Sequence, residues 1–293
     1  MTSLQQLFIG IDGGGTKCKA RIVDAQGQVL GEGLAGPANP VRDLQQTFDS
    51  ITEATESALK QAGLPSQTRS SLIAGVGLAG VNLPLFKSKV EDWQHPFLRM
   101  KLSTDLHIAC LGAHMGQDGA VIITGTGFCA GYKIADCYNE IGGHGFLLGE
   151  QGSGARLGAA SINKTLEVLD GIAHNTPFID DILKQLGCVD AISIVELTVN
   201  AKPAFFAQFA PLVFKHARLK DKFALEIVGA AADYISRMAR RLLAEQPPRI
   251  SLIGGIAEPI SLWLDEDIQL RLSAPLAPPE AGAILLAQQI RIK

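Results

Sequence analysis

Three consecutive glycines, Gly13 to Gly15, stand between two short apolar runs near the start of the chain. The apolar runs predict strands over residues 6–12 and 19–24, so the glycines fall in the turn of a β-hairpin. An ordinary tight turn without a ligand is the alternative, but it uses one or two glycines. Three glycines beside Asp12 and Thr16 leave the backbone N–H groups open, and predict a phosphate-binding hairpin with a carboxylate for Mg²⁺.

The hairpin differs from two better-known phosphate loops. The sequence has no Gly-x-x-x-x-Gly-Lys-Ser/Thr segment, and no Gly-x-Gly-x-x-Gly opens a helix after the first strand. Instead, Asp12-Gly13-Gly14-Gly15-Thr16-Lys17 resembles the first phosphate motif of the sugar kinase, Hsp70 and actin superfamily. Its form resembles the BadF/BadG/BcrA/BcrD ATPase family, in the branch of N-acetylglucosamine kinases and bacterial glucosamine kinases. The resemblance assigns Gly13, Gly14, Gly15, Thr16 and Lys17 to ATP phosphates.

The same resemblance implies an α/β fold of two ribonuclease H-like (actin-like ATPase) lobes, each a mixed sheet flanked by helices. A second glycine hairpin, Thr124-Gly125-Thr126-Gly127, follows a second apolar run and is the counterpart that two similar halves require. Two such hairpins can hold the β- and γ-phosphates from opposite sides. Gly125, Thr126 and Gly127 are therefore assigned to phosphate. The apolar run 250–253 followed by Gly254 and Gly255 resembles the adenosine motif of the family, which implies that these two glycines lie beside the adenosine.

The pattern of strands and helices predicts two lobes. A chain of 293 residues, 47% hydrophobic and 19% charged, is long enough to bury two cores. For the N-terminal lobe, 1–112, we expect strands at 6–12, 19–24, 28–34 and 72–78, a short strand before Asp105 and a helix at 43–62. For the C-terminal lobe, 113–279, we expect a strand at 128–134, a helix from Ser153 to Gly171 and helices at 203–217 and 222–245. A closing helix at about 280–293 is expected to pack back on the first lobe, and closure about a short hinge is expected to enclose the substrate.

Composition narrows the class of protein. A net charge of -3 gives no basic surface for nucleic acid. The five cysteines form no Cys-x-x-Cys pair, which indicates reduced thiols rather than zinc or an iron–sulfur cluster. The sequence shows no basic-then-apolar leader and no apolar run of membrane length, so we expect a cytoplasmic protein without a membrane partner.

Asp105 ends an apolar stretch and precedes a segment typical of a helix. Open α/β sheets bind ligands at the carboxyl ends of their strands, which favours a functional role. Aspartate is also a good helix N-cap, and the residues alone leave both readings open. The resemblance assigns Asp105 as the general base, which contacts the sugar and takes the proton of its 6-hydroxyl as that oxygen attacks the γ-phosphorus.

The glycine-rich segment 142–154 contains one carboxylate, Glu150. A carboxylate can accept hydrogen bonds from two vicinal sugar hydroxyls. The segment resembles the Gly-Gly-x-Gly…Gly-Asp-x-Gly-Ser motif of N-acetylglucosamine kinases, which assigns Gly143 and Glu150 to the sugar. It departs from that motif at Glu150, where the motif has Asp, and at His144, where the mammalian enzymes have Trp. Asn39 matches the Gly-x-x-Asn of the family, which implies a sugar contact; by itself, a loop Asn before Pro is ordinary turn chemistry.

We therefore predict an ATP-dependent kinase that phosphorylates the 6-hydroxyl of glucosamine or N-acetylglucosamine in a site between two lobes, with Mg²⁺ held by Asp12 through water. The resemblance implies a small-molecule aminosugar as partner and a homodimer. One alternative is an ATPase activator of the BadF type, although the cysteine spacing offers no ligand set for its iron–sulfur cluster. Another is a nucleotide-responsive sugar-binding regulator, against which the intact Asp12 and Asp105 argue.

Overall fold

The structure is a computed structural model that describes residues 6–135 and 137–290. It divides into two compact units. Unit 1 comprises Met1–Gly119, Lys133–Tyr138 and Ala274–Lys293, and unit 2 comprises Ala120–Tyr132 and Asn139–Ser273. The chain therefore returns to unit 1 at its C-terminal end.

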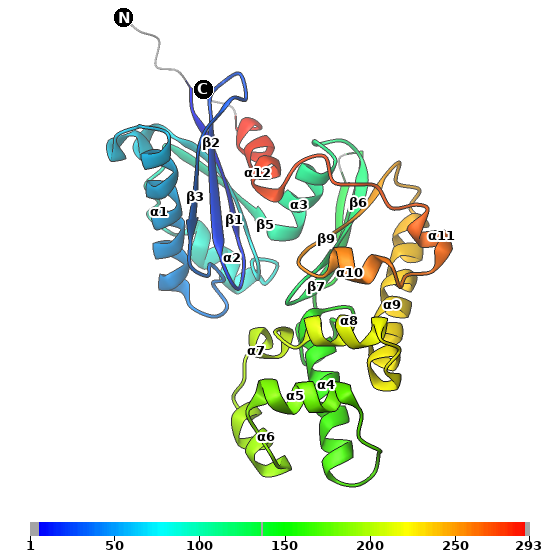
Figure 1. Ribbon diagram of the computed structural model, residues 1–293. Helices are drawn as coiled ribbons and strands as arrows, with labels where there is room; N and C mark the ends of the chain where they lie inside the picture. Colours follow the sequence, from blue (N-terminus) through cyan, green and yellow to red (C-terminus); the bar gives the residue numbers. More distant parts are fainter. Residues whose placement is uncertain (1–5, 136, 291–293) are drawn as a thin grey trace, which may run out of the picture. The chain divides into compact units, whose positions relative to one another are not determined.

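Unit 1 is built on a five-stranded mixed sheet of order β3-β2-β1-β4-β5 (Figure 1). The strands are β1 (Phe8–Gly13), β2 (Cys18–Val23), β3 (Val29–Ala35), β4 (Ile73–Leu78) and β5 (Arg99–Thr104). β1 pairs antiparallel with β2 and parallel with β4, and β4 pairs parallel with β5. The helical elements are α1 (Leu44–Gln61), the 3-10 helix η1 (Ser66–Ser71), α2 (Pro84–Glu91), α3 (Asp105–Ala113) and α12 (Pro279–Gln288). The predicted strands and the predicted helix at 43–62 are confirmed to within a few residues.

Glycines on one face of this sheet let a helix backbone lie directly on the strands. Gly10 of β1 and Gly75 of β4 are register partners, so they form one smooth strip across two strands. A Cβ on Gly75 would overlap the carbonyl oxygen of Ala283, and a Cβ on Gly10 would overlap that of Glu280, both in α12. The α12 helix is therefore seated against backbone rather than against side chains, and its first turn is brought close to β1.

The opposite face of the sheet carries α1, which is amphipathic and begins at an N-cap, Asp43, that accepts a hydrogen bond from Gln46 N. Gly31 and Gly33 of β3 lie under the carbonyls of Ala58 and Ala54, so here too the helix makes close backbone contact. The hydrophobic core between them consists of side chains from both layers, including Ile9, Ile11, Ile22, Ile51, Leu59, Val76 and Leu78.

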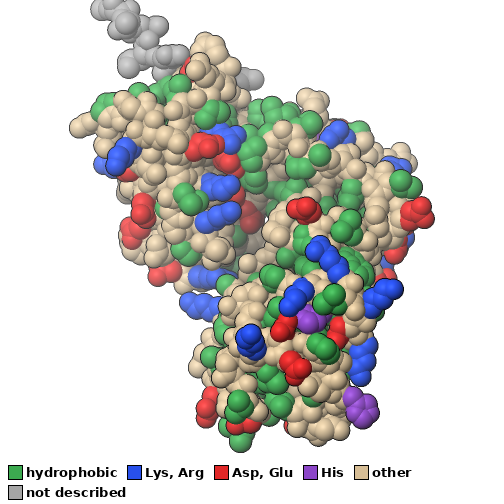
Figure 2. Space-filling view, in the orientation of Figure 1, with side chains coloured by type: hydrophobic (Ala, Val, Ile, Leu, Met, Phe, Trp, Pro, Cys, Tyr) green, Lys and Arg blue, Asp and Glu red, His purple; other side chains and the backbone are tan. Residues whose placement is uncertain are grey.

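Unit 2 combines a four-stranded sheet of order β8-β7-β6-β9 with a cluster of helices (Figure 1). The strands are β6 (Gly119–Thr124), β7 (Phe128–Ile134), β8 (Cys137–Gly142) and β9 (Ile250–Ile253). The helices are α4 (Gly154–Leu169), α5 (Pro177–Leu186), α6 (Ala191–Thr198), α7 (Pro203–Ala207), α8 (Ala210–Arg218), α9 (Lys222–Leu243), α10 (Ala257–Ser261) and α11 (Glu266–Gln269). Acidic and basic side chains are interspersed over these helices in Figure 2. That mixture fits the low net charge of the chain.

Two predictions for the helices need comment. The helix predicted at 203–217 is wrong as one element, because it is divided into α7 and α8 around Gln208 and Phe209. Pro211 has no backbone N–H, so it fits the first turn of a new helix and not the interior of a continuous one. The closing helix expected at about 280–293 corresponds to α12, which ends at Gln288; residues 291–293 lie outside the described residues. None of the described helices is long and apolar enough to span a membrane.

The glycine strip gives a prediction about stability. Gly75→Ala should lower the free energy of unfolding by about 2–4 kcal/mol, because the new methyl group meets the backbone of α12, which has no side chain to move aside. Gly36→Ala is the matched control in the same unit, since a Cβ there has its nearest contact at 3.6 Å, with Ser50 Oγ. That control should change stability by less than about 0.5 kcal/mol in urea unfolding. Equal stability of the two variants would show that α12 is not seated as described.

Candidate active site

The first glycine hairpin joins β1 to β2 in unit 1, and a hydrogen bond from Gly14 N to Lys17 O, 3.0 Å long, closes its turn. Each glycine carbonyl accepts a hydrogen bond from another segment: Gly13 O from Ala79 N at 2.9 Å, Gly14 O from Ala38 N at 2.8 Å and Gly15 O from Arg42 Nη1 at 3.2 Å. Among the described residues, the N–H groups of Gly15 and Thr16 have no acceptor. The turn therefore offers unpaired N–H donors, which suit an anion.

The second glycine hairpin joins β6 to β7 in unit 2 and repeats this arrangement. Gly125 N donates to Gly127 O at 2.9 Å. The carbonyls of Gly125 and Thr126 accept from Gly154 N at 2.7 Å and Ala155 N at 3.3 Å, at the start of α4. Within the described ranges, the N–H groups of Thr126 and Gly127 have no acceptor. Both predicted phosphate hairpins thus have occupied carbonyls and available N–H groups.

Gly254 and Gly255 lie beside the second hairpin, because β9 is the parallel neighbour of β6. Gly254 has a φ of 113°, and a Cβ there would overlap the carbonyl of Thr124. A Cβ on Gly125 would lie 3.6 Å from Gly255 N. The two segments are therefore in close backbone contact, and the position of Gly254 requires glycine.

Asp12 lies near the carboxyl end of β1, in register with Lys19 of β2. Burial, followed by the negative charges of Asp105 and Glu280, raises the pKa of Asp12 to about 7, against a smaller lowering by Lys19 and Lys17. Two carboxyl groups therefore add to the effect of burial on Asp12, and the nearby lysines do not compensate for them. Such a group of acids favours either a bound proton or a bound cation.

Asp105 is the first residue of α3, directly after β5. The N-cap of α3 is Thr104, whose side chain accepts a hydrogen bond from His107 N at 3.1 Å, so the N-cap reading of Asp105 is wrong. Asp105 Oδ1 accepts from Leu106 N at 2.9 Å. Because β1, β4 and β5 are parallel and in register, Asp12 and Asp105 lie at the same edge of the sheet.

Asn39 forms the turn expected of a loop asparagine, since its Oδ1 accepts from Val41 N at 3.0 Å. Its amide nitrogen makes no hydrogen bond with any described residue, and so keeps two donors. Gly80, with a φ of 86°, is adjacent: a Cβ there would lie 3.1 Å from Asn39 Oδ1. The residues alone identified this Asn only as turn chemistry, and the structure adds an available amide.

Glu150 adopts a φ of 63°, in the left-handed region that costs a non-glycine residue about 1–2 kcal/mol. A Cβ placed on Gly127 would lie 3.3 Å from Glu150 Oε2, so this carboxylate lies beside the second hairpin. Gly143, with a φ of 69°, packs against Cys129 in the same unit, and His144 is exposed. Local strain at an acidic residue beside a predicted phosphate turn is typical of a functional position.

Two residues were missed by sequence reasoning. Glu280, in the first turn of α12, is only 5% exposed; its Oε1 contacts Arg21 Nη2 at 3.3 Å, and its Oε2 has no hydrogen-bond partner in the described part of the chain. The sequence indicated α12 only as a packing helix, and nothing in it pointed to a role for this acid. The other missed residue is Arg42, which follows Asn39 by three positions. The positive charge of Arg42 was the signal in the sequence that could have identified it.

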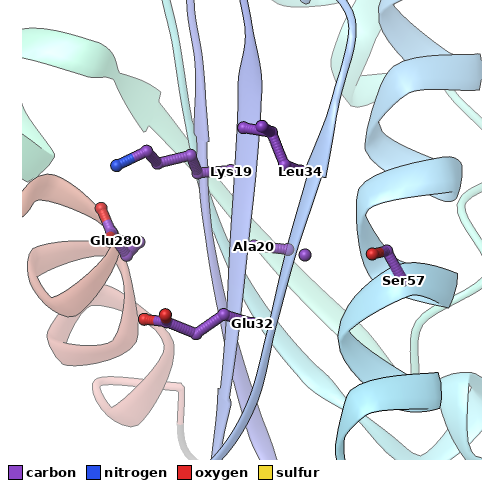
Figure 3. Close-up of a pocket in the computed structure, with 7 residues that line it drawn as sticks. Lys19, Ala20, Glu32, Leu34, Ser57 and Glu280 are labelled. Carbon is purple, nitrogen blue, oxygen red and sulfur yellow. The ribbon is translucent and has the colours of Figure 1, made fainter.

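A pocket in unit 1 is lined by residues of β2, β3, α1 and α12. Figure 3 shows Lys19 and Glu280 on the side of the sheet that faces α12, and Ser57 on α1 at the other side of the strands. The residues that line the pocket are Lys19, Ala20, Glu32, Gly33, Leu34, Ser57 and Glu280. None of the predicted site residues lines it, so this pocket is separate from the glycine hairpin.

Comparison with known proteins gives a consistent result. Residues 9–287 match the model of the BadF/BadG/BcrA/BcrD ATPase family. The glucosamine kinase GspK of Vibrio cholerae is 35% identical over 280 residues, which cover 96% of this chain and 95% of the relative. An N-acetyl-D-glucosamine kinase of Dictyostelium discoideum is 25% identical over 279 residues, 87% of this chain and 86% of the relative.

A crystal structure from Chromobacterium violaceum, of a protein provisionally named N-acetylglucosamine kinase, superposes with a TM-score of 0.92. Its sequence is 32% identical, and the match covers 97% of this chain and 99% of that one. The predicted fold class, two actin-like lobes with mixed sheets and flanking helices, is confirmed. On the match of its sequence and the agreement of its fold, this chain belongs to the BadF/BadG/BcrA/BcrD ATPase family.

Proposed function

We propose that this protein is an ATP-dependent kinase that transfers the γ-phosphoryl group of ATP to the 6-hydroxyl of an aminosugar, glucosamine or N-acetylglucosamine. The observation that supports this most strongly is the shared construction of the two glycine hairpins, in which the carbonyls are bonded and the N–H groups of Gly15, Thr16, Thr126 and Gly127 are available. Backbone donors of this kind bind phosphate oxygens. The relatives named as glucosamine and N-acetylglucosamine kinases support the choice of acceptor.

Asp105 is proposed as the general base. It follows a strand of a parallel sheet at the edge where such sheets bind ligands, and Thr104 rather than Asp105 caps the helix. A loose phosphoryl-transfer transition state needs alignment above all, so the carboxylate holds the 6-hydroxyl in line and accepts its proton. The oxygen of the sugar forms a bond to the γ-phosphorus as the bond to the bridging oxygen of ADP breaks.

The other residues are assigned by chemistry. Gly13, Gly14, Gly15, Thr16 and Lys17 of one unit and Gly125, Thr126 and Gly127 of the other are proposed to bind phosphates, with Gly254 and Gly255 beside the adenosine. Asn39, whose amide keeps two donors, is proposed to bind a sugar hydroxyl, together with Gly143 and Glu150. The left-handed backbone of Glu150 supports a functional role for its carboxylate. A carboxylate and a phosphate repel each other, so a sugar or a cation is expected to lie between Glu150 and the phosphates.

Asp12 is proposed to act on Mg²⁺ through water. A carboxyl group whose pKa is raised by burial and by two neighbouring acids would be stabilised in its charged form by a divalent cation. Within the described ranges no three His, Cys, Asp or Glu side chains are arranged to hold a metal ion by themselves, which fits an ion shared with water and phosphate oxygens. When bound, the ion would neutralise charge on the β- and γ-phosphates.

The function is tested with a panel of acceptors. Release of ADP, measured by a coupled assay, should depend on glucosamine or N-acetylglucosamine, with kcat/KM differing between the two by more than about tenfold. Glucosamine is largely cationic, whereas N-acetylglucosamine carries an acetyl group. A pocket built for either sugar therefore leaves polar groups of the other sugar poorly solvated. Glucose should be the poorest acceptor. A clear preference for glucose would contradict the aminosugar assignment and leave the kinase assignment in place.

Removal of the base gives a second test. Asp105→Asn should reduce kcat by about two to four orders of magnitude, while the dissociation constants of ATP and of the sugar change by less than about threefold. The amide keeps the size and the hydrogen-bonding reach of the side chain but cannot accept the proton. Asp49→Asn, on the exposed surface of α1, is the control and should retain full activity. Near-normal turnover in Asp105→Asn would exclude this residue as the base.

The raised pKa of Asp12 gives a prediction about pH and stability. Its pKa is higher in the folded protein, about 7, than the ordinary value of 3.8, so the folded state binds this proton more tightly and stability falls as pH rises between these values. Asp12→Asn should therefore be more stable than the wild type at pH 8 by about 2 kcal/mol, a figure reduced for partial solvent exposure. The difference should shrink towards pH 4.

Urea unfolding of the ligand-free protein at several pH values measures this effect. Asp49→Asn again serves as the control for the substitution itself, because its side chain is exposed on α1. A constant difference between Asp12→Asn and the wild type from pH 5 to 8 would show that Asp12 is not perturbed in the way described.

A further inference from the structure

Arg42 lies against the phosphate turn of unit 1. Its Nη1 donates to Gly15 O at 3.2 Å, and its guanidinium carbon would lie 3.5 Å from a Cβ placed on Gly15. The guanidinium group therefore sits beside the Cα of the third glycine, next to the N–H groups of Gly15 and Thr16 that have no acceptor among the described residues. Any residue with a side chain at position 15 would project towards this guanidinium.

The charge of Arg42 has no carboxylate partner within ion-pair distance among the described residues. Arg21 and Arg69 of the same unit differ in this respect, since they pair with Glu32 at 2.6 Å and with Glu56 at 2.9 Å. With respect to the described part of the chain, one of the five N–H donors of Arg42 is used, in the bond to Gly15 O. Four donors and a full positive charge therefore remain available at a turn whose own donors are open.

The backbone around Arg42 is held in place. Arg42 N donates to Asn39 O at 3.0 Å, Asp43 N donates to the same oxygen at 3.2 Å, and the Asp43 side chain caps α1. The loop is also bonded to the hairpin itself through Ala38 N and Gly14 O. A guanidinium on a fixed backbone loses less conformational freedom when it binds a ligand, which suits a residue that must meet a phosphate in one geometry.

We propose that Arg42 binds the γ-phosphate of ATP and stabilises the charge on it during transfer. The identity of the phosphate rests on the proposed function: Arg42 follows the proposed sugar residue Asn39 by three positions and contacts the phosphate turn, and the group that passes between nucleotide and sugar is the γ-phosphoryl. Arginine is suited to this because its planar fork donates two parallel hydrogen bonds to phosphate oxygens. An arginine supplied from the same chain acts in this way in other phosphoryl-transfer sites.

In the transfer step, the sugar 6-oxygen bonds to the γ-phosphorus, its proton passes to Asp105, and the bond from the γ-phosphorus to the bridging oxygen breaks with its electron pair left on ADP. Arg42 takes no part in these bond changes. It is a binding residue whose donors stay on the γ-phosphoryl oxygens, so its loss should affect ligands with a γ-phosphate and spare those without one.

The test compares nucleotides that differ only in the γ-phosphate. Calorimetric titration of the full-length protein with Mg²⁺ and either ADP or the non-hydrolysable analogue AMP-PNP gives two dissociation constants for each variant. Arg42→Gln should weaken AMP-PNP binding by at least about tenfold and ADP binding by less than about threefold. Arg42→Lys keeps the charge without the fork and should show a smaller loss of AMP-PNP affinity. Arg69→Gln, which removes a partly buried arginine of the same unit, should match the wild type with both nucleotides.

Activity provides the second readout. With the preferred acceptor, Arg42→Gln should lower kcat by about two to three orders of magnitude and leave the KM of the sugar within about threefold. Equal loss of ADP and AMP-PNP affinity, or no loss of either, would overturn the proposal. If the wild type phosphorylates no sugar, the proposed function fails, and the nucleotide titrations still decide whether Arg42 recognises the γ-phosphate. If Arg42→Gln has a lowered melting temperature, Arg42→Lys decides the result in its place.

Discussion

Close approach of one backbone to another is the constraint on which the rest of unit 1 depends. Gly10 and Gly75 leave no side chain between α12 and the centre of the sheet, so the helix lies directly on β1 and β4. That seating places Glu280 where its charge adds to burial and to the charge of Asp105 in raising the pKa of Asp12. A single methyl group on the strip would separate these layers and weaken the electrostatic coupling, since charge interactions fall with distance.

The two glycine hairpins show how a turn of backbone becomes suited to an anion, which supports their proposed role in phosphate binding. Glycine lets a ligand approach the backbone of the turn, but it exposes the carbonyl oxygens as well as the N–H groups. In both turns the surrounding segments occupy the carbonyl oxygens: Ala79, Ala38 and Arg42 do so for the first hairpin, and Gly154 and Ala155 for the second. Within the described ranges, the N–H groups of two residues in each turn remain available: Gly15 and Thr16 in the first, and Thr126 and Gly127 in the second. Different elements achieve the same result in the two units, which fits a fold built from two similar halves.

Some features of this site were accessible from local sequence and others were not. The hairpins, the strand before Asp105 and the helix that starts after Ser153 follow from short patterns of apolar residues, glycines and caps. Asp105 could not be separated from an N-cap until the structure assigned that role to Thr104. Glu280 could not be found at all, because it lies 268 residues from Asp12 in the chain and its burial depends on where α12 packs.

The sequence by itself determined the kind of fold, the positions of the two glycine hairpins and the family, since these depend on which residue types occur together over a few positions. Only the tertiary structure decided which backbone groups in those turns remain available and which charges surround Asp12. It also decided that the exposed Arg42 donates a hydrogen bond to the first turn. The physical reason is that hydrogen bonding and charge effects act over a few ångströms in space, and folding brings together segments that the sequence keeps apart.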